Sequence, residues 1–222
     1  MTIDYSEQRQ KMVDCQLRTT DINSGPILLA MGSVPRESFV PAAMQTLAYI
    51  DDDVRLSQSG GNERYLMEPS PFAKLLQLAE LSENDVVLDI GTGSGYSAAV
   101  LSILAGSVIA VESESALAES AVETLTELGY DSAVVVEGPL ADGYPSEAPY
   151  DVIFLNGAVD EVPEKLASQL KDDGRIVGVL GSGNTGRATV WTKSNGNLIA
   201  RHAFNTCVPA LPGFEREAAF EF

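Results

Sequence analysis

From Asp85 onward, short apolar runs alternate with segments in which apolar positions recur at helical spacing. The apolar runs are rich in β-branched residues and predict strands at 86–90, 108–111, 133–136, 151–155 and 175–180. The segments between them predict helices at 97–104, 115–128 and 162–170, and Gly129 ends the second of these. Strands separated by helices are typical of an α/β fold with a mostly parallel sheet and helices on both faces.

A different pattern follows the last of these strands. Two alternating segments, 188–191 and 198–201, flank Asn195-Gly196, a pair that favours a tight β-hairpin turn. With this hairpin the predicted sheet has seven strands. The single histidine, His202, lies in the hairpin pattern.

The N-terminal part of the chain has helical spacing over most of residues 4–50. We expect a helix up to about Thr20, a second that begins near Pro26 with Ser24 as its cap, and a short helix at 39–44. Residues 51–68 begin with an acidic run and continue with loop-forming residues. Ser70-Pro71 then opens a helix whose apolar stripe includes Phe72, Leu75 and Leu76.

The turn after the first predicted strand carries three alternating glycines, Gly91-Thr92-Gly93-Ser94-Gly95. In doubly wound sheets, ligands bind at the carboxyl ends of strands, where a glycine turn lets the backbone approach them. The unpaired N–H groups of the helix that begins there favour an anionic group such as a carboxylate or a phosphate. We therefore expect a ligand site at this turn, although a purely structural glycine turn is the alternative.

The spacing within the turn favours S-adenosylmethionine over a dinucleotide. The dinucleotide fingerprint has its third small residue where this chain has Tyr96, and Gly95 comes one residue early. The next strand ends at Glu112, which is 112 − 91 = 21 residues beyond Gly91, the distance expected for a carboxylate that binds ribose hydroxyls. Asp89 adds a second carboxylate beside the turn. A nicotinamide-dependent oxidoreductase is the competing interpretation.

Composition narrows the class of protein further. The chain has 222 residues, enough for one α/β domain with a helical extension, and its 14 basic and 32 acidic residues give a net charge of −18. That charge argues against a nucleic-acid substrate, and the N-terminus has no signal-peptide pattern and the chain no membrane-length apolar run. We expect a cytoplasmic protein without a membrane partner. Cys15 and Cys207 form no CxxC pair, so we expect two reduced, buried thiols and no metal site.

Several longer motifs give the chain a resemblance to the protein-L-isoaspartate O-methyltransferase family. Residues 12–18 look like the first-helix signature of the family, 34–41 match its "VPRE.FVP" segment, and Ala48-Tyr49 follow. Residues 90–101 are similar to "IGTGSGYQAAVL", and further matches lie at 143–145, 148–151 and 204–209. The resemblance implies a Rossmann-like class I methyltransferase fold, S-adenosylmethionine as cofactor and a protein or peptide substrate with an altered aspartyl residue.

Two positions depart from the family pattern. The family segment "GQTISQP" corresponds to residues 63–69, where Met67 replaces the active-site serine and Arg64 replaces the glutamine. The nearby hydroxyls that would have to stand in for it are those of Ser57, Ser59 and Ser70. Arg64 is either a bidentate partner for a substrate carboxylate or a surface arginine. The family segment "GDG" corresponds to 138–140, with Pro139 in place of the aspartate, so that Glu137 or Asp142 would have to compensate.

The resemblance therefore predicts a carboxyl methyltransferase, and the departures leave two alternatives open. One is a cofactor-binding relative without isoaspartyl activity, acting as a sensor or interaction module; the other is a methyltransferase for a small acceptor. We expect residues 1–80 to form a helical extension with the substrate-side loop and 81–222 the cofactor-binding domain, as one compact unit. The sequence indicates no oligomeric state. The predicted cofactor-binding residues are Asp89, Gly91, Thr92, Gly93, Ser94, Gly95, Glu112, Glu137, Gly138 and Asn156, and the predicted substrate-side residues are Arg64, Met67 and Val208.

Overall fold

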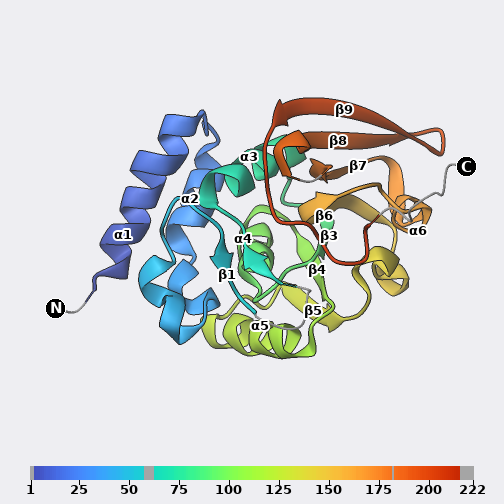
Figure 1. The fold of residues 1–222 in the computed structure, drawn as a ribbon. Coiled ribbons are helices and arrows are strands. Elements are labelled where there is room, and N and C mark those ends of the chain that lie inside the picture. Colours follow the sequence, from blue (N-terminus) through green and yellow to red (C-terminus); the bar gives the residue numbers. More distant parts are fainter. Residues whose placement is uncertain (1–2, 58–62, 182, 216–222) are drawn as a thin grey trace, which may run out of the picture.

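A seven-stranded sheet forms the centre of the computed structural model, which describes residues 3–57, 63–181 and 183–215 (Figure 1). The strand order is β5-β4-β3-β6-β7-β8-β9. The strands are β3 Val86–Ile90, β4 Ser107–Glu112, β5 Ala133–Glu137, β6 Tyr150–Val159, β7 Leu170–Leu180, β8 Arg187–Ser194 and β9 Asn197–Asn205. All neighbours from β5 to β7 are parallel, while β8 and β9 are antiparallel, which confirms the mostly parallel sheet.

Alternate residues of the central strands point to opposite faces of the sheet and build two apolar cores. Val87 and Phe154 belong to the larger core, together with residues of the N-terminal helices and of α3 Pro69–Ala79, α4 Tyr96–Leu104 and α5 Ser115–Leu128. Leu88 and Leu155 belong to the second core, which α6 Glu164–Ser168 and the C-terminal segment cover with Leu166, Leu211 and Phe214. Because both faces are buried, the strands are apolar almost throughout, as parallel strands require.

The N-terminal helices lie together on one side of the molecule, away from the β8–β9 hairpin (Figure 1). Helix α1 Tyr5–Met12 begins at Asp4, whose carboxylate accepts from the backbone N–H groups of Ser6 and Glu7. It continues as a π-helical turn at Val13–Leu17 and a 3-10 turn at Arg18–Thr20, so the helix predicted up to Thr20 is regular only in its first half. Helix α2 Gly25–Ser33 has the predicted Ser24 cap.

The segment predicted as an irregular loop, 51–68, contains a short two-stranded sheet. Strand β1 Val54–Arg55 pairs antiparallel with β2 Tyr65–Leu66. The backbone N–H of Leu56 donates to the carbonyl oxygen of Arg64 at 2.8 Å and extends this pairing by one residue. Ser59 lies outside the described residues.

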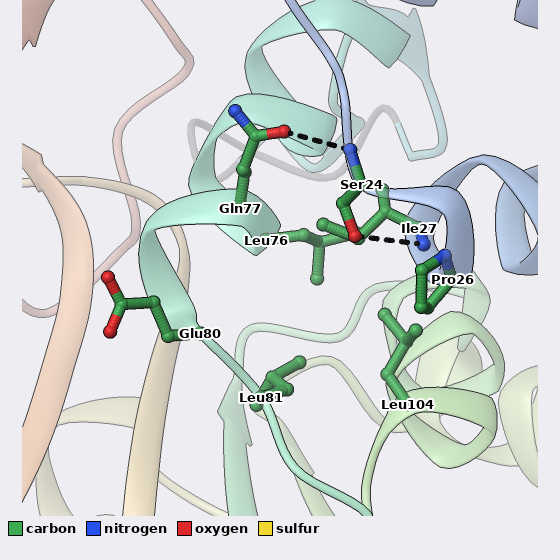
Figure 2. Close-up of a pocket in the computed structure, with 8 residues that line it drawn as sticks. All are labelled: Ser24, Pro26, Ile27, Leu76, Gln77, Glu80, Leu81 and Leu104. Carbon is green, nitrogen blue, oxygen red and sulfur yellow. Dashed lines mark hydrogen bonds between the residues drawn. The ribbon is translucent and has the colours of Figure 1, made fainter.

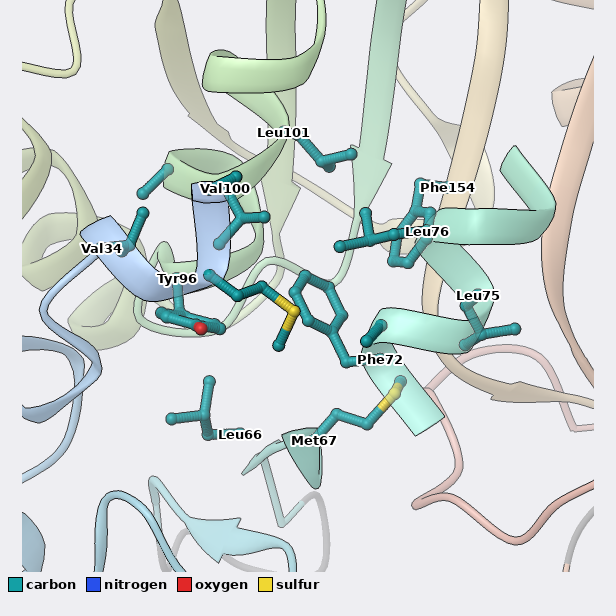
Figure 3. Close-up of a cluster of buried hydrophobic side chains, with 14 of the residues drawn as sticks. Val34, Leu66, Met67, Phe72, Leu75, Leu76, Tyr96, Val100, Leu101 and Phe154 are labelled. Atoms are coloured by element: carbon teal, nitrogen blue, oxygen red, sulfur yellow. The ribbon is translucent and has the colours of Figure 1, made fainter. Parts of the chain in front are cut away.

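Figure 3 shows how β2 and α3 join the larger core. Leu66 and Met67 pack in one apolar cluster with Phe72 of α3 and Tyr96 of α4, and both are almost fully buried. The ring centroids of Phe72 and Tyr96 are 5.7 Å apart. The segment that precedes α3 is thus fixed against the start of α4, directly after the glycine turn.

The prediction of buried thiols is wrong, because Cys15 and Cys207 are both exposed and unpaired. The helical turn around Cys15 buries Met12, Val13 and Leu17 instead, which leaves Cys15 on the solvent side. Within the described ranges, no group of His, Cys, Asp and Glu side chains is arranged to hold a metal ion. No helix in the same ranges is long and apolar enough to cross a membrane.

Candidate functional site

The glycine turn lies between β3 and α4, at the centre of the sheet. Gly91, Gly93 and Gly95 have φ angles of 80°, 60° and 95°, a left-handed region that favours glycine. The backbone N–H of Gly91 donates to the carbonyl oxygen of Val111 at 2.8 Å, which ties the turn to the end of β4. β3 is the point at which the strand order reverses, since β4 and β6 flank it. The turn therefore lies at the switch point where such sheets bind ligands.

Glu112 reaches this turn from the end of β4, as its spacing predicted. Its carboxylate is completely buried. Oε2 accepts from the backbone N–H of Gly93 at 2.7 Å, and Oε1 accepts from the backbone N–H groups of Ser113 and Glu114 at 2.8 and 3.2 Å. These N–H groups hold the carboxylate in one orientation beside the turn. Such a fixed carboxylate is suited to accept hydrogen bonds from the hydroxyl groups of a ribose.

Arg64 forms a buried ion pair with this carboxylate. Nη2 of Arg64 is 3.0 Å from Oε2 of Glu112 and donates to the carbonyl oxygen of Gly91 at 2.8 Å. The arginine side chain is 4% exposed, so it lies inside the site and is no surface residue. Arg64 is therefore not the surface arginine that the sequence allowed, and its pairing with a substrate carboxylate stays a prediction, because the carboxylate it contacts belongs to the protein itself.

Apolar side chains cover the turn beside Arg64. A Cβ atom on Gly91 would lie 2.5 Å from Cδ2 of Leu211, and one on Gly93 would lie 2.8 Å from Cδ1 of Leu56. Leu211 is held near the turn because its N–H donates to the carbonyl oxygen of Ala158 in β6 at 2.8 Å, and the N–H of Ala158 donates to the carbonyl oxygen of Pro209 at 2.9 Å. Neither leucine could be predicted as a neighbour of the turn, since both lie far from it along the chain.

A polar network lies beneath the turn. Asn156 donates through Nδ2 to the carbonyl oxygen of Gly91 at 3.0 Å and to Oγ of Ser97 at 3.2 Å. The Ser97 hydroxyl donates to Oδ2 of Asp89 at 2.6 Å and lies 3.2 Å from Oγ1 of Thr92. Burial of the Asp89 carboxyl raises its pKa to about 7. Asp89, Thr92 and Asn156 are thus brought together as predicted, and Ser97 is a member of the network that the sequence did not single out.

The other predicted cofactor-binding residues lie at the margin. Ser94 is buried and its hydroxyl donates to the carbonyl oxygen of Phe39. Glu137 lies opposite Glu112 in the strand register, but its side chain is exposed and accepts from Oγ of Ser115 at 2.6 Å. The N–H of Gly138 donates to the carbonyl oxygen of Glu112 at 3.0 Å, which keeps the start of the Gly138-Pro139-Leu140 segment against β4. Asp142, the other candidate to compensate for Pro139, pairs with Lys165 at 2.5 Å.

An open cavity of about 720 Å³ lies between the acidic run and the C-terminal segment. Its lining consists of Asp52, Asp53, Glu63, Tyr65, Cys207, Val208, Pro209 and Ala210. Val208, a predicted substrate-side residue, thus lines this cavity. Burial and the neighbouring Asp51 raise the pKa of Glu68, beside the acidic run, to about 6.

The two described hydroxyls near Met67 that could stand in for the family serine are both hydrogen-bonded within the chain. Ser70 is buried and its hydroxyl donates to Oγ1 of Thr20 at 2.9 Å. Ser57 donates to Oε2 of Glu114 at 2.8 Å. Met67 itself packs in the apolar cluster shown in Figure 3.

Another cavity, of about 260 Å³, lies between α2, the end of α3 and the end of α4 (Figure 2). None of the predicted site residues lines it. Its polar side chains serve local structure, because Oγ of Ser24 accepts from the N–H of Ile27 and Oε1 of Gln77 accepts from the N–H of Ser24. This cavity is therefore separate from the glycine-turn site.

Comparisons with known proteins agree with the fold and with the ligand site at the glycine turn. The family model for protein-L-isoaspartate (D-aspartate) O-methyltransferase matches residues 7–211. The chain is 38% identical over 183 residues to the protein-L-isoaspartate O-methyltransferase of Methanoregula boonei, covering 82% of each chain. It is 40% identical over 177 residues to that of Herpetosiphon aurantiacus, covering 80% of this chain and 77% of the relative.

Solved structures show the same fold. One described as a protein-L-isoaspartate O-methyltransferase has a TM-score of 0.82 at 29% identity, and the match covers 92% of this chain and 66% of that longer one. A Plasmodium falciparum structure, described as a beta-aspartate methyltransferase in complex with S-adenosyl-L-homocysteine, has a TM-score of 0.76. At 20% identity over 95% of this chain and 99% of that one, this second likeness concerns the fold alone.

The sheet order, the glycine turn and Glu112 together define a Rossmann-like class I methyltransferase, the class whose cofactor is S-adenosylmethionine. Within that class, the chain belongs to the protein-L-isoaspartate (D-aspartate) O-methyltransferase family. The fold and the family predicted from the sequence are both confirmed.

Proposed function

We propose that this protein transfers a methyl group from S-adenosylmethionine to the carboxylate of an isoaspartyl residue in a protein or peptide. The observation that carries the proposal is the family match over residues 7–211 together with a buried Glu112 carboxylate at the glycine turn. The cofactor-binding residues proposed here are those of the turn, Asp89, Glu112, Glu137, Gly138 and Asn156, and the substrate-side residues are Arg64, Met67 and Val208.

The donor and acceptor groups at the turn fit this cofactor. Glu112 offers a carboxylate for ribose hydroxyls, and the Gly91 carbonyl oxygen offers an acceptor for an ammonium group. Asn156 Oδ1 is a buried acceptor without a partner among the described residues. When bound, S-adenosylmethionine supplies a methyl group on a sulfonium sulfur.

The reaction requires little acid–base catalysis by the protein. A carboxyl group of ordinary pKa is ionised near neutral pH, so no general base has to activate the isoaspartyl nucleophile. The task of this chain is therefore to hold the acceptor in line with the methyl group and to exclude water. Positioning of that kind contributes up to about 7–11 kcal/mol at its limit. The open cavity lined by Tyr65, Val208 and Pro209 supports this role, because it offers space for the acceptor.

An assay with labelled S-adenosylmethionine and two matched peptides tests the proposal. The peptides have the same sequence, one with an isoaspartyl residue and the other with an ordinary aspartyl residue. We expect a base-labile methyl ester on the isoaspartyl peptide and none above background on the control. Equal labelling of the two peptides, or no labelling of either, would overturn the proposed methylation of isoaspartyl residues.

Two observations favour a second candidate, a cofactor-binding relative without isoaspartyl activity. Met67 stands in the apolar cluster at the position of the family serine, and Arg64 lies over the Glu112 carboxylate. Calorimetric titration with S-adenosylhomocysteine, combined with the methylation assay, distinguishes the two candidates. Binding of S-adenosylhomocysteine without methylation of any carboxylate supports this second candidate. The expected cytoplasmic location stays a prediction.

A further inference from the structure

We propose that Arg64 sets the cofactor affinity of this protein by competing with S-adenosylmethionine for the Glu112 carboxylate and the Gly91 carbonyl oxygen. The inference rests on the proposed function, because it concerns the same site. Its basis is that Nη2 of Arg64 contacts both acceptors at once, at 3.0 and 2.8 Å. Cofactor binding then requires that the guanidinium leave the turn.

The competition follows from the chemistry of the two groups. S-adenosylmethionine presents ribose hydroxyls, an α-ammonium group and a sulfonium, which are donors or cations that require acceptors or negative charge. Its α-carboxylate is an anion and is suited to the N–H groups at the start of α4. Glu112 is the buried carboxylate at the turn, and the Arg64 guanidinium already neutralises it. If both were present, the cations of the cofactor would face a second cation in a buried site, where charges interact strongly. Arg64 and the cofactor therefore exclude each other.

Steric contacts at the turn lead to the same conclusion. Nη2 of Arg64 is 2.8 Å from the position of a Cβ atom on Gly91, and Leu56 comes equally close to that position on Gly93. A ligand that contacts the backbone of the turn needs the space that these side chains fill. Leu56 and Arg64 are joined by a backbone hydrogen bond at the β1–β2 pair, so the two side chains leave together when this pair withdraws.

The β1–β2 pair is held by few backbone hydrogen bonds, although Val54 and Leu66 are buried in the larger core. It contains two residue pairs, Val54 with Leu66 and Arg55 with Tyr65, and lies outside the seven-stranded sheet. Segments with few backbone hydrogen bonds open at low free-energy cost compared with core strands. The Arg64–Glu112 ion pair is the buried charged contact that holds this element over the turn.

Calorimetric titration of the full chain with S-adenosylhomocysteine tests the competition. We compare the wild type with Arg64→Gln, which keeps a donor for Glu112 but removes the charge and shortens the side chain. Arg55→Gln is the matched control, because Arg55 lies on the same β1–β2 pair and interacts with the exposed Glu63. We expect Arg64→Gln to bind at least about ten-fold more tightly and Arg55→Gln to stay within about two-fold of the wild type.

Each other outcome has a distinct meaning. Equal or weaker binding by a folded Arg64→Gln variant, with measurable binding by the wild type, overturns the competition but leaves the proposed cofactor in place. Absence of binding by the wild type and all variants overturns the proposed function and this inference with it.

Amide hydrogen exchange of the wild-type protein tests the competition without relying on the folding of the Arg64→Gln variant. We expect saturating S-adenosylhomocysteine to slow amide exchange at the glycine turn and to accelerate it at 54–56 and 64–66. Slower exchange in both segments would overturn the inference, because the β1–β2 pair would then close on the ligand and not withdraw.

Discussion

The guanidinium of Arg36 donates through Nη2 to the carbonyl oxygen of Met67 at 2.7 Å. Through Nε it donates to the carbonyl oxygen of Ala48, also at 2.7 Å, and its Cζ atom lies 4.9 Å from the centroid of the Tyr96 ring. The side chain is completely buried, and burial lowers the pKa of Arg36. The arginine of the "VPRE" segment thus joins the backbone at Met67 to the first residue of the helix that follows the glycine turn.

Replacement of Arg36 by methionine should lower the free energy of unfolding by about 2–4 kcal/mol, because two buried carbonyl oxygens lose their donor. Urea denaturation followed by circular dichroism measures the change. Arg18→Met is the control, since Arg18 is about half exposed and pairs with Asp14, and it should change stability by less than about 1 kcal/mol. An Arg36→Met variant as stable as the wild type would contradict this prediction, because relief of the buried charge would then offset the loss of both hydrogen bonds.

A comparison of alanine substitutions at Gly95 and Gly129 separates the cost of backbone strain at the glycine turn from the cost of overpacking. Both have positive φ, 95° and 78°. A Cβ atom on Gly95 would lie 3.1 Å from Cβ of Ala121, whereas one on Gly129 would have no neighbour within 4 Å. Gly129→Ala should therefore cost about 1–2 kcal/mol of backbone strain. Gly95→Ala should cost the same and a further 1–3 kcal/mol, roughly, from overpacking against α5. Equal losses for the two variants in urea denaturation would contradict the packing contribution.

Most of the fold can be predicted from the sequence because the strand and helix patterns are local. Strand β3 and helix α5 have the predicted bounds, and Gly129 ends α5 in the left-handed conformation. Strand β6 runs past its predicted end at Leu155, through an irregularity in register between Phe154 and Ala158. Asn156 and Gly157 interrupt the apolar pattern there, so the sequence alone does not indicate that the strand continues.

The site is less predictable because its decisive contact is not local. The position of Glu112 followed from its distance to the glycine turn, and the structure places it there. Its partner Arg64 lies 48 residues earlier in the chain, on a segment without a strong pattern, and no spacing rule connects the two. A cationic residue in a chain with net charge −18 is typical of a surface position, whereas Arg64 is buried. The approach of Leu211 from the C-terminal segment was likewise not encoded in any local pattern.

Asp89 should make the stability of this protein depend on pH. Burial raises its pKa from 3.8 to about 7, so the folded state holds the proton more tightly than the unfolded state does. The free energy of unfolding should therefore fall as the pH rises from about 4 to about 7, by up to roughly 4 kcal/mol. Asp89→Asn removes this titration. The free energy of unfolding of the variant, measured by urea denaturation at several pH values, should therefore rise relative to that of the wild type as the pH rises. A stability difference that is the same at every pH would contradict the prediction.

Met67 is expected to contribute packing and no reacting group, although it stands where the family has a serine. It is 3% exposed and lies in the cluster with Leu66 and Phe72 (Figure 3). Met67→Ser should lower the free energy of unfolding by about 2–5 kcal/mol, because the smaller side chain leaves a cavity and places a hydroxyl among apolar groups. Met67→Leu is the matched control and should cost less than about 1.5 kcal/mol, with methylation of the isoaspartyl peptide retained. Urea denaturation and the labelled-methyl assay measure both properties. If Met67→Ser were as stable as the wild type and methylated the peptide faster, this position would face the acceptor, and the packing role would be wrong.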